Sequence, residues 1–133
     1  MGKIGIADSI LLKPDRLTPD ERTVMQAHPV IGERICTPLK SLRLVLPIIR
    51  HHHERWDGSG YPDRLAGETI PLTARILQVV DLFDAFTTQR PYKPAFALEE
   101  TFALMRDETA KGWWDARLIE SFISLVEEER LLR

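Results

Sequence analysis

Three consecutive histidines, His51, His52 and His53, are the residues whose type and spacing most directly suggest chemistry. Histidine is the commonest metal ligand in proteins, and its neutral imidazole suits zinc, iron, manganese or nickel. Successive residues of a helix point about 100° apart, so adjacent imidazoles would reach a site from two directions or serve two ions. The alternative is a helix end whose exposed histidines stabilise the helix dipole. By themselves, three histidines favour this second interpretation.

Asp81 lies in a strongly apolar segment that is predicted to be a helix, and it shifts the balance toward a metal site. A carboxylate buried in such a segment is costly unless it is paired or bound to a metal ion. Asp84, three residues further on, would lie close to the same face. Two interpretations stay open in equal measure. Asp81 is a metal ligand with a neighbouring acid, or both carboxylates pair with arginines such as Arg75 or Arg90.

Basic residues follow this segment directly, at Arg90 and Lys93. Cations at the C-terminal end of a helix stabilise its dipole, which is one explanation for them. Next to a metal site they would instead bind a phosphate, the arginine as a bidentate fork and the lysine as a point charge. Lys3 stands alone near the start, where solvation is the simplest interpretation. Trp113 and Trp114 are interpreted as packing residues rather than as a surface that stacks bases.

Helices joined by loops must position these side chains, because no alternating strand pattern longer than a few residues occurs. Thr18, Pro19 and Glu21 form a helix start with a capping box. Asp115 is the expected cap of the last helix, and Pro47 is expected to kink the third. The predicted helices cover 19–27, 29–37, 40–53, 71–88, 97–111 and 116–130, and residues 4–17 are predicted to form a loop. The predicted fold class is all-α, in one domain.

Composition excludes several classes of protein. The chain has 133 residues, 44% of them hydrophobic and 29% charged, as in an ordinary globular domain. Its 18 basic and 20 acidic residues give a net charge of −2, which provides no strong field for DNA, RNA or a membrane surface. No apolar stretch approaches the roughly 20 residues that span a bilayer. The single cysteine, Cys36, fits a reducing compartment, so we expect a cytoplasmic protein.

The segment from His52 to Pro62, with its His-His-Glu start and Gly-Tyr-Pro end, resembles the signature of HD-GYP domains. These are bacterial cyclic di-GMP phosphodiesterases within the metal-dependent HD superfamily. The resemblance covers nearly the whole chain, and its other matching segments are 2–5, 13–14, 17–19, 28–29, 31–32, 70–72, 74–76, 81–85 and 90–92. A motif this long and ordered is far more specific than a pair of histidines. It implies an HD-superfamily helical bundle.

The resemblance also implies a role for each matching residue. The metal-ligand positions of the family, which suit iron, manganese or zinc, match His28, His52, His53 and Asp81. Lys3 matches a lysine that faces the catalytic site, and Arg90 and Lys93 match positions that hold the substrate phosphate. The loop linked to substrate access and to contacts with diguanylate cyclase domains matches Gly60, Tyr61 and Pro62. Tyr61 is therefore expected to contact substrate. The implied activity is phosphodiester hydrolysis in second-messenger signalling.

The chain departs from the family at its start, because the His-Asp dyad would stand directly before Met1. The helices that precede this dyad in the family would also be expected before Met1. We therefore expect residues 1–133 to be the C-terminal part of a domain, with one metal ion instead of a bridged pair and weak or no activity. Uncovered apolar faces would favour a homo-oligomer, and family members usually carry a receiver or sensor domain upstream. The alternative is a non-catalytic signalling module that binds a diguanylate cyclase domain or a cyclic dinucleotide.

Overall fold

The computed structural model describes residues 2–89, 91 and 94–132. Within these residues the protein consists of helices and loops without a strand, which confirms the predicted all-α class. The α-helices are α1 (Asp8–Leu11), α2 (Pro19–Met25), α3 (His28–Cys36), α4 (Leu46–His51), α5 (Leu72–Thr87), α6 (Leu98–Ala110) and α7 (Ala116–Leu131). Three 3-10 turns are η1 (Lys3–Gly5), η2 (Lys40–Leu42) and η3 (Gly67–Thr69). No described helix combines the length and the apolar character needed to cross a membrane.

The predicted capping signals are confirmed at two helix starts. The hydroxyl of Thr18 accepts a hydrogen bond from the N–H of Glu21 at 3.2 Å, and the Glu21 carboxylate accepts one from the N–H of Thr18 at 2.8 Å. Asp115 caps α7 by accepting hydrogen bonds from the N–H groups of Arg117 and Leu118. These contacts satisfy backbone donors that a helix start leaves unpaired, and they set where α2 and α7 begin.

Two predictions about local structure are wrong. The helix predicted over 40–53 is in fact the turn η2 followed by α4, which begins at Leu46. Pro47 does not kink a helix but lies in the first turn of α4, where its missing N–H leaves no hydrogen bond unmade. The loop predicted over 4–17 contains most of η1 and the single turn α1. Asp8 stands at the start of α1, where a carboxylate is favourable for the helix dipole.

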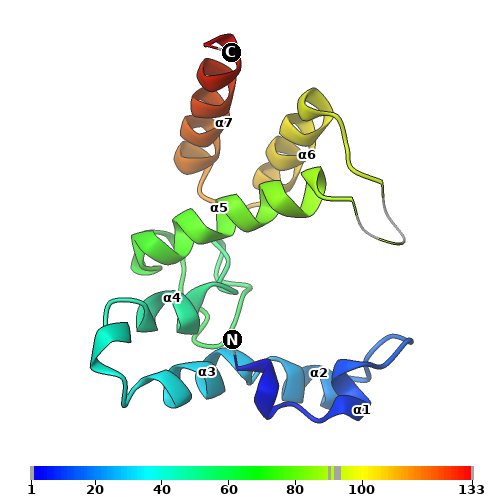
Figure 1. Ribbon diagram of the computed structural model, residues 1–133, viewed down its shortest axis with the longest axis vertical. Coiled ribbons are helices and arrows are strands. Elements are labelled where there is room, and N and C mark those ends of the chain that lie inside the picture. The colour runs from blue at the N-terminus through cyan, green and yellow to red at the C-terminus, as the bar shows by residue number, and fades with distance from the viewer. Residues whose placement is uncertain (1, 90, 92–93, 133) are drawn as a thin grey trace.

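Helix α5 crosses the middle of the molecule, between α3 and α4 on one side and α6 and α7 on the other (Figure 1). Its contacts with α6 and α7 form the main hydrophobic core, whose buried members are Val79, Leu82, Phe102, Met105, Ile119 and Ile123. The predicted central position of this helix is therefore confirmed. One face of α5 nevertheless stays open, with Leu72, Ile76 and Val80 between 44% and 52% exposed.

Candidate metal centre and its pocket

Three of the four histidines converge between α3 and the end of α4. His28 is the first residue of α3, whereas His52 and His53 directly follow α4. The ring centroids are 4.1 Å apart for His52 and His53, 4.8 Å for His28 and His53, and 5.8 Å for His28 and His52. Ligand atoms of all three lie within 4.8 Å of one another. Three neutral imidazoles at this spacing can hold a divalent metal ion.

Backbone carbonyls orient two of these rings. The Nδ1 atom of His28 lies 2.7 Å from the carbonyl oxygen of Met25, and that of His52 lies 2.9 Å from the carbonyl oxygen of Ile49. A carbonyl oxygen only accepts hydrogen bonds, so Nδ1 carries the proton in both rings. The unprotonated nitrogen is then Nε2, the form in which histidine binds a metal. The structure therefore supplies the orientation and the tautomer that a metal site requires.

The end of α4 is what allows His52 and His53 to share a site. Because α4 ends at His51, His53 is not bound by helical spacing and its ring can approach that of His52. The guanidinium of Arg50 holds this end of α4 in place. It donates to Glu33 of α3 and to both oxygens of Asp63, at 2.7 and 2.9 Å. The expectation that adjacent imidazoles reach the site from two directions rests on a continuous helix, which is absent here.

Burial favours the neutral form of His28 and His53. It lowers the pKa of His53 to about 3, and repulsion from the neighbouring histidines and Lys3 acts in the same direction. Burial also lowers the pKa of His28, although its hydrogen bond to the carbonyl of Met25 opposes the change. Both rings are therefore neutral near pH 7 and available to a metal ion.

Lys3 lies close enough to the histidines for its positive charge to act on them. Its ammonium group contributes to the lowered pKa of His28 and of His53. Gly2 makes this placement possible. It adopts a φ of 85°, and a Cβ atom there would lie 1.9 Å from the carbonyl oxygen of His28. Only glycine allows the chain to pass so close to the start of α3.

Asp81 is not brought into the histidine group. Its side chain is exposed on α5, and its carboxylate does not belong to the set of mutually close ligand atoms. The expectation of a buried carboxylate at this position is therefore wrong, because the buried residues of α5 are Ala74, Gln78, Val79 and Leu82. The Asp84 carboxylate accepts a hydrogen bond from the hydroxyl of Thr88 at 2.9 Å. Arg90 and Lys93, the predicted phosphate-binding residues, lie outside the described residues.

The signature loop folds back against Glu54. This carboxylate is fully buried, and its two oxygens accept hydrogen bonds from the N–H groups of Asp63 at 2.8 Å and Leu65 at 3.0 Å. Gly60 is buried as well, and a Cβ atom there would lie 2.4 to 2.5 Å from backbone atoms of Glu54 and Arg55. The loop conformation therefore depends on Glu54, which binds the backbone after Pro62, and on Gly60, which allows the loop to pack against the backbone of Glu54 and Arg55.

Tyr61 forms a wall beside the histidines. Its ring stacks on that of His53, with centroids 4.9 Å apart and an interplanar angle of 20°. Its N–H donates to the carbonyl oxygen of His53 at 3.1 Å, and the Tyr61–Pro62 peptide bond is cis. Burial raises the pKa of Tyr61, while the positive charge of Arg55 acts against this rise. The phenol is therefore neutral at pH 7.

A pocket of about 410 Å³ lies in front of His52, His53 and Tyr61. Gly60 of the predicted loop also lines this pocket. The remaining lining residues were not singled out as site residues from the sequence: Arg22, Gln26, Glu54, Arg55, Ser59 and Trp114. Arg55 stands inside the signature, two residues after His53, and that position was the available signal. Arg22 and Trp114 come from distant parts of the chain and carry no local signal. Trp114 also packs against the main core, so its predicted packing role is confirmed.

His51 stays apart from the other three histidines. Its Nδ1 atom lies 3.5 Å from a carboxylate oxygen of Asp63 and 3.7 Å from one of Glu54. These three residues form a second group of ligand-type atoms that lie within 4.8 Å of one another. Arg50 already neutralises Asp63 there, so this group is better described as an ion-pair network.

Comparison with known proteins identifies the family of this chain. The HD domain family model matches residues 1–118. The "Cyclic di-GMP phosphodiesterase response regulator RpfG" of Xanthomonas campestris pv. campestris is 44% identical over 125 residues, which is 92% of this chain and 33% of that protein. A "Cyclic di-GMP phosphodiesterase" of Thermotoga maritima is 45% identical over 130 residues, 96% of this chain and 35% of that protein.

A third relative has a different named substrate. The "3'3'-cGAMP-specific phosphodiesterase 2" of Vibrio cholerae is 42% identical over 102 residues, covering 75% of this chain and 20% of that protein. The chain thus spans about a third or less of the length of these relatives. The family match extends over most of the chain and includes the histidine group and the Gly-Tyr-Pro loop. This chain therefore belongs to the HD domain family, as an HD-GYP-type member.

Proposed function

We propose that this chain is a metal-dependent phosphodiesterase domain that acts on cyclic di-GMP. One observation carries the proposal: His28, His52 and His53 converge, and in two of them the Nδ1 proton is committed to a carbonyl oxygen. Two relatives that are 44% and 45% identical are named as cyclic di-GMP phosphodiesterases. A third is named for 3'3'-cGAMP, so the substrate class is a cyclic dinucleotide, and cyclic di-GMP is the specific proposal.

Each residue of the site has a distinct task in this proposal. The three histidines hold a divalent ion, which when bound stabilises negative charge on the phosphate and lowers the pKa of a coordinated water molecule. Iron, manganese and zinc all suit an imidazole site. Lys3 adds positive charge near the histidine rings, and Tyr61 lines the pocket with its ring stacked on that of His53. We retain Arg90 and Lys93 as phosphate-binding residues on the family resemblance.

We infer that this chain holds one ion and turns substrate over slowly. Only three ligand side chains meet at the site among the described residues, and the Asp81 carboxylate stands apart from them. A pair of metal ions bridged by carboxylates needs more ligands than these three imidazoles provide. Binding of a cyclic dinucleotide without any hydrolysis would identify the chain as a binding module instead.

Metal content tests the proposal directly, with the neighbouring histidine as a matched control. After loading with Mn²⁺ or Fe²⁺ and removal of free ions, we expect about one ion per wild-type chain. His52→Ala should lose the ion and any hydrolysis of cyclic di-GMP. His51→Ala removes an adjacent imidazole outside the group and should keep both. Metal retained by His52→Ala, or a wild-type chain that takes up none, would contradict the proposed site.

The predicted partner loop remains part of the proposal. Gly60 is buried and Tyr61 is half-buried against His53, whereas Asp63 and Arg64 are exposed on the outer side of the loop. A diguanylate cyclase domain would therefore contact the loop mainly through Pro62 and the residues after it. We further propose contacts with an upstream receiver or sensor domain. We also propose that the protein forms a homo-oligomer, which the oligomeric state of the full-length protein would test.

A further inference from the structure

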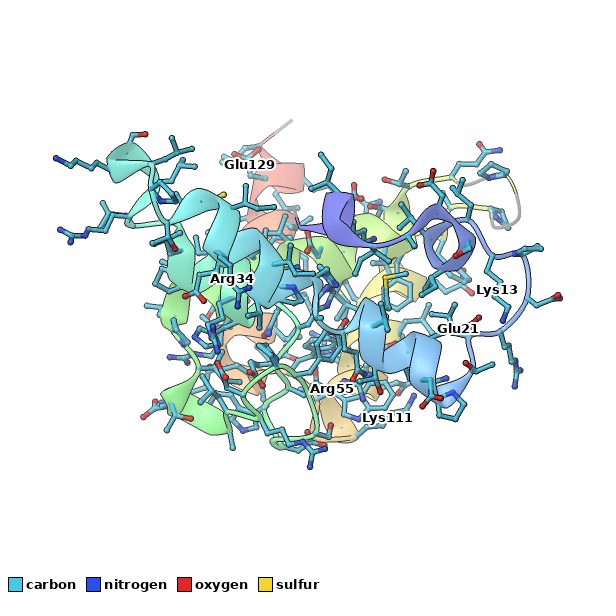
Figure 2. The ribbon with its side chains drawn as sticks, turned by 90° about the horizontal axis from the view of Figure 1, so that it is seen from below. Lys13, Glu21, Arg34, Arg55, Lys111 and Glu129 are labelled. Carbon is cyan, nitrogen blue, oxygen red and sulfur yellow. The ribbon has the colours of Figure 1, made fainter. Side chains whose placement is uncertain are left out.

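Two cations share the ring of Trp113. The guanidinium carbon of Arg55 lies 4.1 Å from the ring centroid, and the ammonium nitrogen of Lys111 lies 4.8 Å from it. The two side chains are neighbours at one edge of the molecule (Figure 2). None of the ion pairs between described residues includes either of them. The aromatic face attracts both cations, and the hydrogen-bond donors of Arg55 are not taken up by a carboxylate.

Arg55 differs from Lys111 in one respect, because it lines the pocket in front of the histidines. Its positive charge acts on Tyr61, another lining residue, by opposing the rise that burial causes in the pKa of the phenol. Arg22 adds a second guanidinium to the lining, and the one carboxylate among the lining residues is Glu54. Both oxygens of Glu54 already accept backbone hydrogen bonds. The charge of Arg55 also acts on the carboxylate of Asp57. Asp57 does not line the pocket, however, and it accepts a hydrogen bond from the N–H of Ser59.

We propose that Arg55 binds a phosphate group of the substrate and that Trp113 positions its guanidinium for this contact. The inference deepens the proposed function and rests on it. A cyclic dinucleotide carries two phosphodiester groups, so when one lies at the metal site the other needs a positive charge elsewhere in the pocket. A guanidinium meets two phosphate oxygens at once through parallel N–H donors. Stacking on Trp113 restricts the side chain beforehand, which reduces the entropy lost when the phosphate binds.

Binding measurements on the metal-loaded chain test this, with cyclic di-GMP and inorganic phosphate as the two probes. Calorimetry follows the dinucleotide, and phosphorus NMR follows phosphate. Arg55→Met should weaken the binding of both by about 10- to 100-fold, as expected when a hydrogen-bonded charge pair is lost. Lys111→Met is the matched control, since it removes the same charge from the same aromatic ring outside the pocket. It should change either affinity less than about threefold.

The positioning role of Trp113 needs a separate measurement. Trp113→Phe keeps an aromatic face and should keep the affinity for cyclic di-GMP, whereas Trp113→Leu should lower it by about tenfold. In an Arg55→Met background the Trp113→Leu change should have no further effect. A further loss in that background would mean that Trp113 acts only through the fold and would overturn its positioning role.

The outcomes separate this inference from the proposed function. Equal binding by wild type and Arg55→Met, or equal losses in Arg55→Met and Lys111→Met, would overturn the inference and leave the proposed function intact. A wild-type chain that binds neither probe would also overturn it. Phosphate binding that depends on Arg55, without any binding of cyclic di-GMP, would support the phosphate contact and contradict the proposed substrate.

Discussion

Replacing Gly60 with alanine tests how the signature loop closes on the candidate metal site. A Cβ atom at this position would lie 2.4 Å from the backbone nitrogen of Arg55 and 2.5 Å from the Cα and carbonyl carbon of Glu54. All three are backbone atoms, so no side-chain rotation relieves the contact. The loop must move by about 1 Å to reach ordinary van der Waals separation. That movement strains the hydrogen bonds by which Glu54 holds Asp63 and Leu65.

We expect Gly60→Ala to lower the free energy of unfolding by about 2–4 kcal/mol, from overpacking and from weakened hydrogen bonds to a buried carboxylate. Urea denaturation of the metal-free chain measures this change. Metal affinity should fall as well, because the loop carries Tyr61 against the ring of His53. Ser59→Ala, at the exposed neighbouring position, is the control and should change stability by less than about 0.5 kcal/mol. A Gly60→Ala chain within that margin would refute the geometry.

Three further predictions concern stability. Asp115→Ala removes the cap of α7 and the 2.7 Å ion pair with Arg75. Urea denaturation should therefore show a free energy of unfolding lowered by about 3–5 kcal/mol. A decrease below about 1 kcal/mol would contradict a coupled buried pair. Thr18→Ala breaks the capping box of α2 and should cost about 1 kcal/mol in the same assay, whereas no change would mean that the cap is not formed in solution. Because burial lowers the pKa of His53 and His28, these two imidazoles bind protons in the unfolded chain at pH values where they remain neutral in the folded metal-free chain. Its stability should therefore fall as the pH drops from about 6.5 to 5, above the range where most carboxylates titrate, and a flat profile would contradict the lowered values.

Most helices could be predicted from the sequence because their signals are local. The capping box at Thr18 and the cap at Asp115 act within a few residues, so a reader of the sequence sees every participant. The prediction over 40–53 was wrong because the start of that helix is not set by a local signal. Its apolar residues are compatible with one long helix, and only the packing of α4 against α3 and α5 selects the shorter one that begins at Leu46.

The candidate metal ligands could be named from the family resemblance, but the arrangement of their side chains could not. His28 lies more than twenty residues before His52, so their approach depends on how α3 packs against α4. Asp81 shows the limit of reasoning from an apolar segment. A helix inside a fold has an exposed side as well, and the sequence around Asp81 does not say which residues lie there.

By itself, the sequence determined the all-α class, the family, the three histidines that can bind a metal and the loop that faces them. These follow from the types and order of residues along a short length of chain. Only the tertiary structure decided that His52 and His53 leave the helix to meet His28, and that Asp81 stands apart from them. It also decided that Trp113 stacks under Arg55 at the pocket. The physical reason is that such contacts join residues far apart in sequence, and their energies depend on how whole helices pack.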